Sequence, residues 1–536
     1  KQVYVANKAR SIARPPFNPL RNTLDFLDDD GHRLVLTEEI PLYTTMLALG
    51  YRLFGERDDV GHALSLLGSL LAILALYDLA KREQGERVAL LSALMFTSAP
   101  LFVFYGRAVL ADPWMLAGLL ASAAAYRRFL DGQGRLWLAA AALAGLLAVA
   151  FKYFGLMVLI VLIDMTRRSA GWRACWKGPL VLVAMAMVVP TALWMALVFL
   201  QSPNPVASGW SVGQEVYPYL IIQAPGVLLD RNFYHGLLVR FPLHDFGPVA
   251  SALMLVGILA TLRRRVTPGP LAAWTLMGLL FYVALGPKLI DHDYYELMLL
   301  PAASLWAGWG VEALLRLAGR LATRHPAQDQ AGSLQGPPSS TSWRAGGVSP
   351  LSENSIISPV QGLRPSAREQ SAIRLPVQSA LLTILLASVV LVQGPWAQGE
   401  MFRLDAGKVA LADRMRQASR PSDRVLVIGP GIALVTVVHY SGREGWAERC
   451  LSLPDDWRQR IDHCRARGAS LVAVYLDPKN ADARNSFQPL FRAFPQVEHL
   501  RSLPGRDPGH AEFVLLKLPP EDPARLASQA PARNRP

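Results

Sequence analysis

Long apolar runs follow one another through residues 61–317 and recur at 377–395, with polar loops between them. Ten runs are long enough, or nearly so, to cross a bilayer as helices. They cover approximately residues 61–80, 87–104, 111–128, 136–151, 153–166, 178–200, 246–263, 270–287, 296–317 and 377–395. The fourth and fifth runs are short and predict a broken helical hairpin around Lys152. The pattern therefore predicts a mainly α, polytopic membrane protein with about ten visible spans.

The hydrophobic pattern changes after residue 400. Residues 423–429, 470–476 and 513–518 have the short apolar runs of buried strands, and residues 407–417 and 455–465 have helical spacing. This alternation predicts a small C-terminal α/β domain. Near the N-terminus, residues 41–55 carry apolar positions at helical spacing and predict an amphipathic helix that lies in the membrane interface.

These patterns divide the chain into six parts. We expect a first outer loop with interfacial helices (1–60), a transmembrane module (61–320), a flexible Ser/Pro/Gln/Gly-rich cytoplasmic linker (321–375), a last span (376–398), the outer soluble α/β domain (399–520) and a loose tail (521–536).

Composition supports a membrane protein and excludes several other classes. Apolar residues make up 52% of the 536 residues and charged residues only 18%, which excludes disorder along the whole chain. Three cysteines are too few for a disulfide scaffold. Cys450 and Cys464 both fall in the outer domain, where a disulfide and two free thiols are equally compatible with the sequence.

The net charge of +13 is compatible with nucleic-acid binding or with membrane topology. The basic residues lie in every second loop between the apolar runs, which the positive-inside rule places in the cytoplasm. Residues 1–60, 201–245, 288–295 and the chain after about 395 are then on the outer side. This distribution argues against nucleic acid as a partner. Because residues 1–60 are placed outside, we also expect one further span before the first residue.

Polar residues at membrane depth are costly, so they indicate function. The candidates gather at the outer ends of spans, in four separate segments. They are Glu38 and Glu39, Arg107 and Asp112, Lys152 and Tyr153, and Asp291, His292, Asp293, Tyr294 and Tyr295. The cations could neutralise a phosphate, and a carboxylate could act as a general base or hold a divalent cation.

Each candidate also has a structural interpretation. Asp112 precedes Pro113 and could serve only as a helix N-cap. Lys152 could extend to the headgroups, and Arg107 could anchor the interface. The glutamates at 38 and 39 fit a solvated first helical turn. His292 fits a surface histidine, and the two tyrosines at 294 and 295 fit an aromatic belt. The sequence has no paired-His or Cys/His zinc motif and no nucleotide-binding loop.

Several segments resemble bacterial membrane glycosyltransferases of the family 39 type, which have the GT-C fold. The resembling segments are EEIPLYTTMLALGYRLFG, FYGRAVLADPW, FKYFG, HDYYELMLLP and YSGREGW, in the expected order. The family includes protein O-mannosyltransferases and the aminoarabinose transferase for lipid A. The resemblance implies a multi-pass protein of the bacterial inner membrane, with its active site and C-terminal domain on the periplasmic side.

The resemblance also implies a reaction. A sugar would pass, with inversion, from a polyprenyl-phosphate donor to a lipid, glycan or protein acceptor of the cell envelope. Glu39 and Asp112 would form the acidic site, and Arg107 and Lys152 would bind the donor phosphate. Glu38, His292, Asp293, Tyr294 and Tyr295 would contact substrate. The resemblance names no resident cofactor.

One departure concerns the catalytic base. The family usually carries an acidic residue just after its first span, and we expect that position to precede the first residue of this chain. Asp112 or Glu39 would otherwise take that role.

Two other classes of protein fit the sequence less well. A transporter or flippase would need charged groups at the bilayer midplane and related inverted halves, and neither is visible in the sequence. A membrane scaffold with a partner-binding outer domain would leave the outer charges unexplained. The enzyme hypothesis predicts a lipid-facing groove that leads to an outer cavity bounded by Glu39, Asp112, Lys152 and His292.

Overall fold

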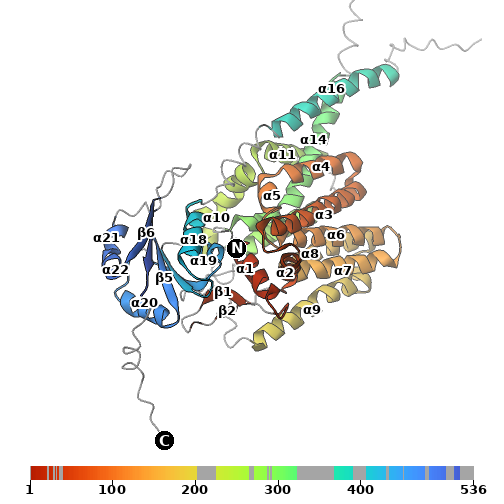
Figure 1. The fold of residues 1–536 in the computed structure, drawn as a ribbon. Coiled ribbons are helices and arrows are strands. Elements are labelled where there is room, and N and C mark those ends of the chain that lie inside the picture. Colours follow the sequence, from red (N-terminus) through yellow and green to blue (C-terminus); the bar gives the residue numbers. More distant parts are fainter. Residues whose placement is uncertain are drawn as a thin grey trace, which may run out of the picture.

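A helical part and an α/β part lie side by side in the computed structural model (Figure 1). The structure describes residues 2–20, 23–27, 31, 33–35, 40–201, 225–264, 271–286, 289, 292–322, 367–389, 391, 406–429, 434–450, 452–476, 482–501 and 512–519. The tail at 521–536 and most of the predicted linker, residues 323–366, lie outside these ranges, as do Asp28, Asp29 and Asp30.

All ten apolar runs coincide with helices, as the sequence predicts. These are α3 (Asp58–Gln84), α4 (Glu86–Ser98) with α5 (Pro100–Tyr105), α6 (Asp112–Leu130), α7 (Arg135–Phe151), α8 (Val158–Ala170), α9 (Pro179–Gln201), α11 (Pro248–Arg264), α12 (Leu271–Ala284), α14 (Leu300–Ala322) and α16 (Ala367–Ser388). Within the described ranges, Asp58–Gln84 and Trp172–Leu197 are long and apolar enough to cross a membrane. Residues 231–245 and 248–263 would add a third span if their 114° bend lies within one broken span. The count of ten spans therefore stays a prediction.

Short irregular helices connect the long ones. They are the 3₁₀ helices η1 (Tyr153–Met157), η2 (Trp172–Trp176), η3 (Pro225–Leu229) and η5 (Asp293–Met298), the α-helix α10 (Arg231–His235) and the π-helix η4 (Gly236–Asp245). Lys152 has extended backbone with φ of −164°, which ends α7 and begins η1. This break confirms the predicted interruption of the hairpin at Lys152.

The helices of the membrane module enclose one apolar core. α6 packs between α3 and α7, and α14 packs against α4, α11 and α16. The crossing of α11 and α14 depends on Gly257 and Gly310, because a Cβ atom at Gly310 would lie 1.9 Å from the carbonyl oxygen of Leu253. Small residues at such crossings let two helix backbones approach closely.

A seven-stranded sheet forms the centre of the α/β part, in the order β2-β1-β4-β3-β5-β7-β6. The strands are β1 (Thr23–Leu27), β2 (Arg33–Val35), β3 (Arg424–Gly429), β4 (Glu444–Arg449), β5 (Ala469–Leu476), β6 (Gln496–Arg501) and β7 (Glu512–Lys517). β1, β4, β3 and β5 run parallel, whereas β2, β7 and β6 are antiparallel to their neighbours. The three strands predicted from the sequence are β3, β5 and β7.

Two strands of this sheet come from the segment that we expected to be an outer loop. β1 pairs with β4, where Phe26 lies opposite Gly445, and β2 extends the sheet beyond β1. The sheet of the α/β part is thus built from residues 1–60 as well as from 399–520, and the sequence pattern missed both N-terminal strands.

Helices cover both faces of the sheet. On one face lie α18 (Ala406–Ala418), α19 (Leu434–Ser441) and α1 (Gln2–Ala13), whose apolar side chains share a core with β1, β3 and β5. On the other face lie α20 (Trp457–Ala466) and α22 (Gln488–Ala493), next to the short α21 (Ala483–Ser486). The helices predicted at 407–417 and 455–465 correspond to α18 and α20. Cys450 and Cys464 are free thiols, as is Cys175.

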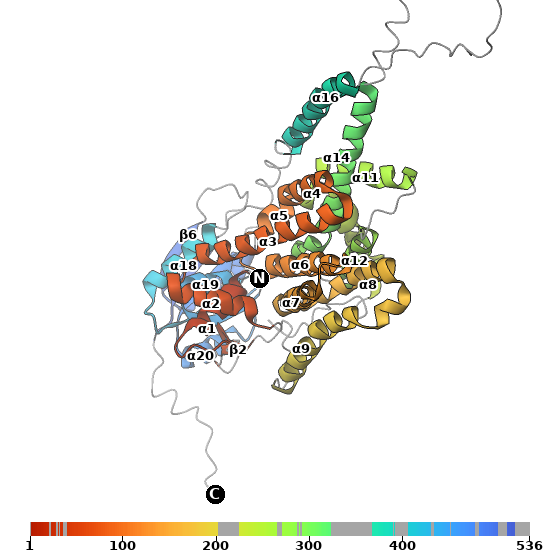
Figure 2. The same ribbon diagram turned by 90° about the vertical axis from the view of Figure 1, so that its right-hand side faces the viewer.

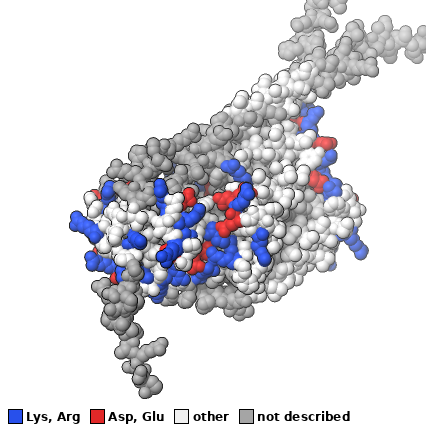
Figure 3. Space-filling model, viewed as in Figure 1, with Lys and Arg blue, Asp and Glu red and all other residues white. Residues whose placement is uncertain are grey.

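α1 and α2 (Leu42–Phe54) lie at the junction of the two parts, and Figure 2 shows them in front of α19. α1 contacts α2, β1 and α19, and α2 contacts α3 and α7. The predicted helix at 41–55 is therefore confirmed as α2, and the junction sets how the sheet faces the membrane module. Charged side chains are dense over the α/β part in Figure 3, whereas much of the described helical surface is uncharged.

Candidate functional site

A buried ion pair forms the centre of the site. Asp112 is the first residue of α6, and Lys152 follows the last residue of α7, the helix that packs along α6. The Lys152 Nζ donates a hydrogen bond to Asp112 Oδ1 at 2.7 Å, and the two side chains are 1% and 4% exposed. Two charges removed from water require such a partner, because an isolated buried charge is very costly.

This pair corrects two of the structural interpretations. Ala111, not Asp112, occupies the N-cap position of α6. Asp112 lies inside the helix, and its carboxylate accepts the hydrogen bond from Lys152. Lys152 is buried and therefore does not extend to the headgroups. Both residues instead form one polar centre in apolar surroundings.

Aromatic rings enclose the ammonium group of Lys152. Its Nζ lies 4.9 Å from the ring centroid of Tyr294 and 4.7 Å from that of Tyr295, both on η5, and 5.7 Å from that of Phe154. The two tyrosine rings are 4.3 Å apart and are 6% and 5% exposed, so they pack inside the protein rather than in an aromatic belt. Cation–π attraction at this distance stabilises the ammonium group.

His292 and Asp293 extend this cluster. The His292 ring lies 5.4 Å from the ring of Tyr294, and the side chain is half-buried. Asp293 Oδ1 accepts a hydrogen bond from the Tyr105 hydroxyl at 2.5 Å. The structure thus brings together six of the sequence-predicted residues. They are Asp112, Lys152, His292, Asp293, Tyr294 and Tyr295.

The other predicted residues have different positions. Arg107 lies in the turn between α5 and α6 with its side chain exposed, and its carbonyl oxygen lies 2.6 Å from His62 Nδ1. Glu38, Glu39 and Asp291 lie outside the described residues. Their roles stay predictions.

A small cavity of about 30 Å³ adjoins Asp112. Its lining includes Lys8, Tyr43 and Thr44 but, among the described residues, neither Lys152 nor His292. α1 and α2 form the other walls of this cavity, and the outer cavity expected between Glu39, Asp112, Lys152 and His292 stays a prediction. The volume admits a water molecule or a group of the size of a hydroxyl.

The sequence analysis missed Lys8 and Tyr43. Lys8 is 7% exposed although it lies in a segment without a long apolar run, so nothing in the local pattern marked it as buried. The Tyr43 hydroxyl lies 2.7 Å from the Ser65 hydroxyl. Burial raises the pKa of Tyr43 well above its usual value, so the phenol stays neutral and can only donate or accept hydrogen bonds.

A second buried charged cluster lies close to the first along the chain. Arg240 on η4 donates to Glu296 Oε1 at 2.5 Å, and its Nε lies 3.7 Å from Asp245 Oδ2. Glu296 is fully buried and directly follows Tyr295. Its position within an apolar run was the signal that could have identified it.

The described residues contain no group of three or more His, Cys, Asp and Glu side chains arranged to hold a metal ion. Asp112 has an ammonium group as its partner instead. A divalent cation at the site therefore stays a proposal.

A family model described as dolichyl-phosphate-mannose-protein mannosyltransferase matches residues 38–194. This segment contains Glu38, Glu39, Arg107, Asp112 and Lys152. No curated protein matches the chain at a significant level.

Solved structures show the same fold. ArnT from Cupriavidus metallidurans bound to undecaprenyl phosphate is similar with a TM-score of 0.56 and 16% identity, over 96% of this chain and 93% of that chain. Its apo state gives a TM-score of 0.56 and 15% identity over the same shares. The oligosaccharyltransferase of Archaeoglobus fulgidus, tethered with an acceptor peptide, gives a TM-score of 0.50 and 12% identity, over 95% of this chain and 69% of that chain. The chain therefore has the GT-C fold, as expected from the sequence, which is a fold of integral membrane glycosyltransferases.

Proposed function

We propose that the protein transfers a sugar from a polyprenyl-phosphate donor to an acceptor hydroxyl at the outer face of the membrane, with inversion. The acceptor oxygen attacks the anomeric carbon and forms the new glycosidic bond. The bond from that carbon to the phosphate oxygen breaks, and its electron pair leaves with polyprenyl phosphate. The proton of the acceptor hydroxyl passes to a carboxylate of the site.

The buried pair of Asp112 and Lys152 is the observation that carries this proposal. A transferase of this kind needs a fixed cation for the leaving phosphate and a carboxylate for the acceptor proton. Here both groups lie together, and the segment that holds them matches the mannosyltransferase family model. The likeness to ArnT bound to undecaprenyl phosphate adds support at the level of the fold.

We assign the roles as follows. One ammonium proton of Lys152 is donated in the hydrogen bond to Asp112. The other two are left to bind the oxygens of a donor phosphate. Asp112, or Glu39, takes the proton from the hydroxyl group of the acceptor substrate. The cavity beside Asp112 admits a group of hydroxyl size, and Ile40, which follows Glu39 in the sequence, lines it. Arg107 would meet the phosphate from the exposed turn before α6.

The proposed donor site beside the ammonium group of Lys152 is completed by His292, Asp293, Tyr294 and Tyr295. Glu38 would contact substrate on the acidic side of the site. The tyrosine rings would keep water from the leaving phosphate, which strengthens its attraction to Lys152. The sugar would be a hexose or a pentose, and the acceptor an envelope lipid, glycan or protein. We place the protein in the bacterial inner membrane, with the site and the α/β domain on the periplasmic side.

Transfer of radiolabelled sugar from a polyprenyl-phosphate donor by the purified full-length protein tests the proposal. We expect the substitution that removes the base, Asp112→Asn or Glu39→Gln, to lower kcat at least about 100-fold, as loss of a general base does. Asp59→Asn is the matched control, because Asp59 also lies in the first turn of a helix but is exposed. Parallel assays with EDTA and with Mg²⁺ or Mn²⁺ test whether transfer requires a divalent cation.

Thermal unfolding and donor binding of each variant separate a chemical effect from loss of the fold. Wild-type rates in both Asp112→Asn and Glu39→Gln would overturn the assignment of the base. Movement of a lipid-linked sugar across the membrane without transfer would instead indicate a flippase. Mass spectrometry of envelope glycans with and without the protein would identify the sugar and its acceptor.

A further inference from the structure

A second pocket lies away from Asp112, where the α/β part meets the membrane module. Its volume is about 650 Å³, within the range of small-molecule sites. Its lining comes from α1, from the end of α2 and the following turn, from α18 and from the end of α19. Five arginines face it with two carboxylates. They are Arg10, Arg14, Arg52, Arg57 and Arg416, with Glu56 and Asp58.

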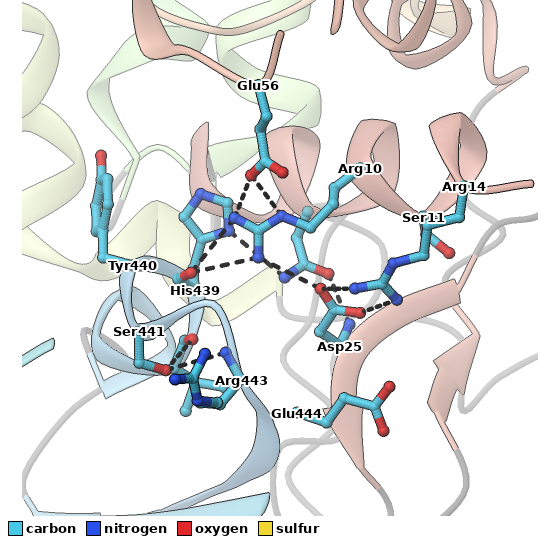
Figure 4. A network of polar contacts seen from close by, with 12 residues as sticks. Arg10, Ser11, Arg14, Asp25, Glu56, His439, Tyr440, Ser441, Arg443 and Glu444 are labelled. Carbon is cyan, nitrogen blue, oxygen red and sulfur yellow. Dashed lines mark hydrogen bonds and ion pairs between the residues drawn. The ribbon is translucent and has the colours of Figure 1, made fainter. Parts of the chain in front are cut away.

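Two of these arginines are fixed by a buried carboxylate on the neighbouring strand β1. Asp25 on β1 is 1% exposed and accepts hydrogen bonds from Arg14 at 2.7 and 3.1 Å and from Arg10 at 3.4 Å (Figure 4). Arg10 also pairs with Glu56 and donates to the carbonyl oxygen of His439 at 3.3 Å. A buried carboxylate thus fixes two guanidinium groups at the wall of the pocket.

The other three arginines are exposed and can adapt to a ligand. Arg57 and Arg416 make surface ion pairs with Asp59 and Asp413, and such pairs contribute little to stability. Arg52 lies over the ring of Phe17 at 5.3 Å and has no carboxylate partner in the described part of the chain. The pocket therefore combines two arginines anchored by Asp25 with three exposed arginines, which suits a multivalent oxyanion.

The turn after α19 belongs to the YSGREGW segment. Tyr440 and Gly442 line the pocket, and the Tyr440 hydroxyl donates to Asp58 Oδ2 at 3.3 Å. Arg443 is buried and donates to the carbonyl oxygens of Arg416 and Ser419, which fixes the turn. This segment therefore joins the α/β part to the start of α3.

The same two helices line this pocket and the small cavity beside Asp112. α1 contributes Lys8 to the cavity and Arg10 to the pocket, and α2 contributes Thr44 to the cavity and Arg52 to the pocket. Eight residues of helix separate Thr44 from Arg52, which is about 12 Å at 1.5 Å per residue. One extended substrate could reach both places.

We infer that this arginine pocket binds an oxyanion group of the acceptor, a phosphate or carboxylate on a glycan or on a lipid headgroup, while the acceptor hydroxyl lies beside Asp112. The inference rests on the proposed transferase function for its role, but the binding can be tested without transfer. The pocket would then select acceptors by charge and take no part in the bond-making step.

The test uses the full-length protein in nanodiscs of phosphatidylcholine. Glucose 6-phosphate is the soluble probe, and nanodiscs doped with phosphatidic acid provide the lipid probe. The test variant is Arg52→Gln with Arg416→Gln, and Arg52→Lys with Arg416→Lys keeps the charge. Arg458→Gln is the control, because Arg458 is an exposed arginine on α20 outside the pocket.

We expect the double Gln variant to bind the probe about 10- to 100-fold more weakly, since hydrogen bonds to charged groups are the strong ones. The Lys variant should recover part of the loss, and Arg458→Gln should bind as the wild type does. Binding of glucose 6-phosphate alone would indicate a glycan phosphate, and binding of phosphatidic acid alone a lipid headgroup. In transfer assays the acceptor KM should rise while the donor KM and kcat are retained.

Two results would overturn the inference: no binding of either probe by the wild type, or equal binding by the double Gln variant. If the wild type binds a probe through these arginines but transfers no sugar, the pocket is supported and the transferase proposal fails. Thermal unfolding of every variant checks that the fold is retained.

Discussion

Lys152 donates a hydrogen bond to Asp112 across 40 residues of chain, and both side chains are almost fully removed from water. The contact joins the end of α7 to the start of α6, so it fixes the geometry of the hairpin as well as the charges of the site. Removal of one partner leaves the other charged and buried.

We therefore expect Lys152→Met to lower the free energy of unfolding by about 3–5 kcal/mol, because Asp112 loses its counter-ion. Asp112→Asn should also destabilise the protein. The double variant should cost clearly less than the sum of the two, and unfolding of the detergent-solubilised chain measures this coupling. Additive effects would mean that the pair contributes no interaction energy.

The ring of Tyr295 should matter more than its hydroxyl. Its centroid lies 4.7 Å from Lys152 Nζ, which is a cation–π distance. Tyr295→Phe keeps the ring and should leave the donor KM close to that of the wild type, whereas Tyr295→Leu should raise it about 2- to 30-fold. Equal losses in the two variants would indicate that the hydroxyl, which both lack, is the group that matters.

His439 gives the junction of the two parts a pH dependence. Burial, helped by the charge of Arg10, lowers the pKa of His439 from 6.5 to about 3. Between these values the unfolded chain binds a proton that the folded imidazole does not. Stability is therefore complete above pH 6.5 and is lost as pH falls toward 3, by about 2 kcal/mol at pH 5.

Unfolding of the full chain between pH 4 and 8 measures this loss, and His439→Gln is the comparison. The relevant quantity is the slope of the free energy of unfolding with pH, because the substitution itself can change stability at every pH. The same slope in both proteins would show that other groups dominate.

The crossing of α11 and α14 should not tolerate a side chain at Gly310. A Cβ atom there would lie 1.9 Å from the carbonyl oxygen of Leu253, so the helices would have to separate. We expect Gly310→Ala to cost about 1–3 kcal/mol, the usual range for overpacking. Gly226→Ala is the control, since its Cβ would meet no described atom within 4 Å.

The sequence identified most of the central site because charge is rare within apolar runs. Asp112, Lys152 and residues 292–295 stand out against their neighbours, and the topology brought them to one membrane face. Lys8 could not be found in this way, because its burial arises only when α1 packs in the folded protein. Arg240 lies in a loop between two apolar runs, and its partners Glu296 and Asp245 became visible only from the fold.

The elements of the C-terminal domain were predictable where strands are apolar throughout. β3 and β5 have such sequences, since they lie inside the sheet with neighbours on both sides. β1 and β2 are short, and β4, the strand that joins them to the rest of the sheet, is distant in the chain, so the local pattern carried little signal. The number of spans stays a prediction, because within the described ranges two helices, or three with the bent pair, are long and apolar enough to cross a membrane.

The sheet has a consequence for biogenesis, because its first and last strands are made far apart in time. Arg33 on β2 pairs with Glu444 on β4, 411 residues later in the chain. At ordinary rates of synthesis this interval is roughly 20 to 80 s, during which the edge of β1 lacks its partner. The sheet is therefore completed only after the residues of the helical part have been synthesised. By the same reasoning, residues 399–520 produced alone would expose the open edge of β4 and be prone to aggregate.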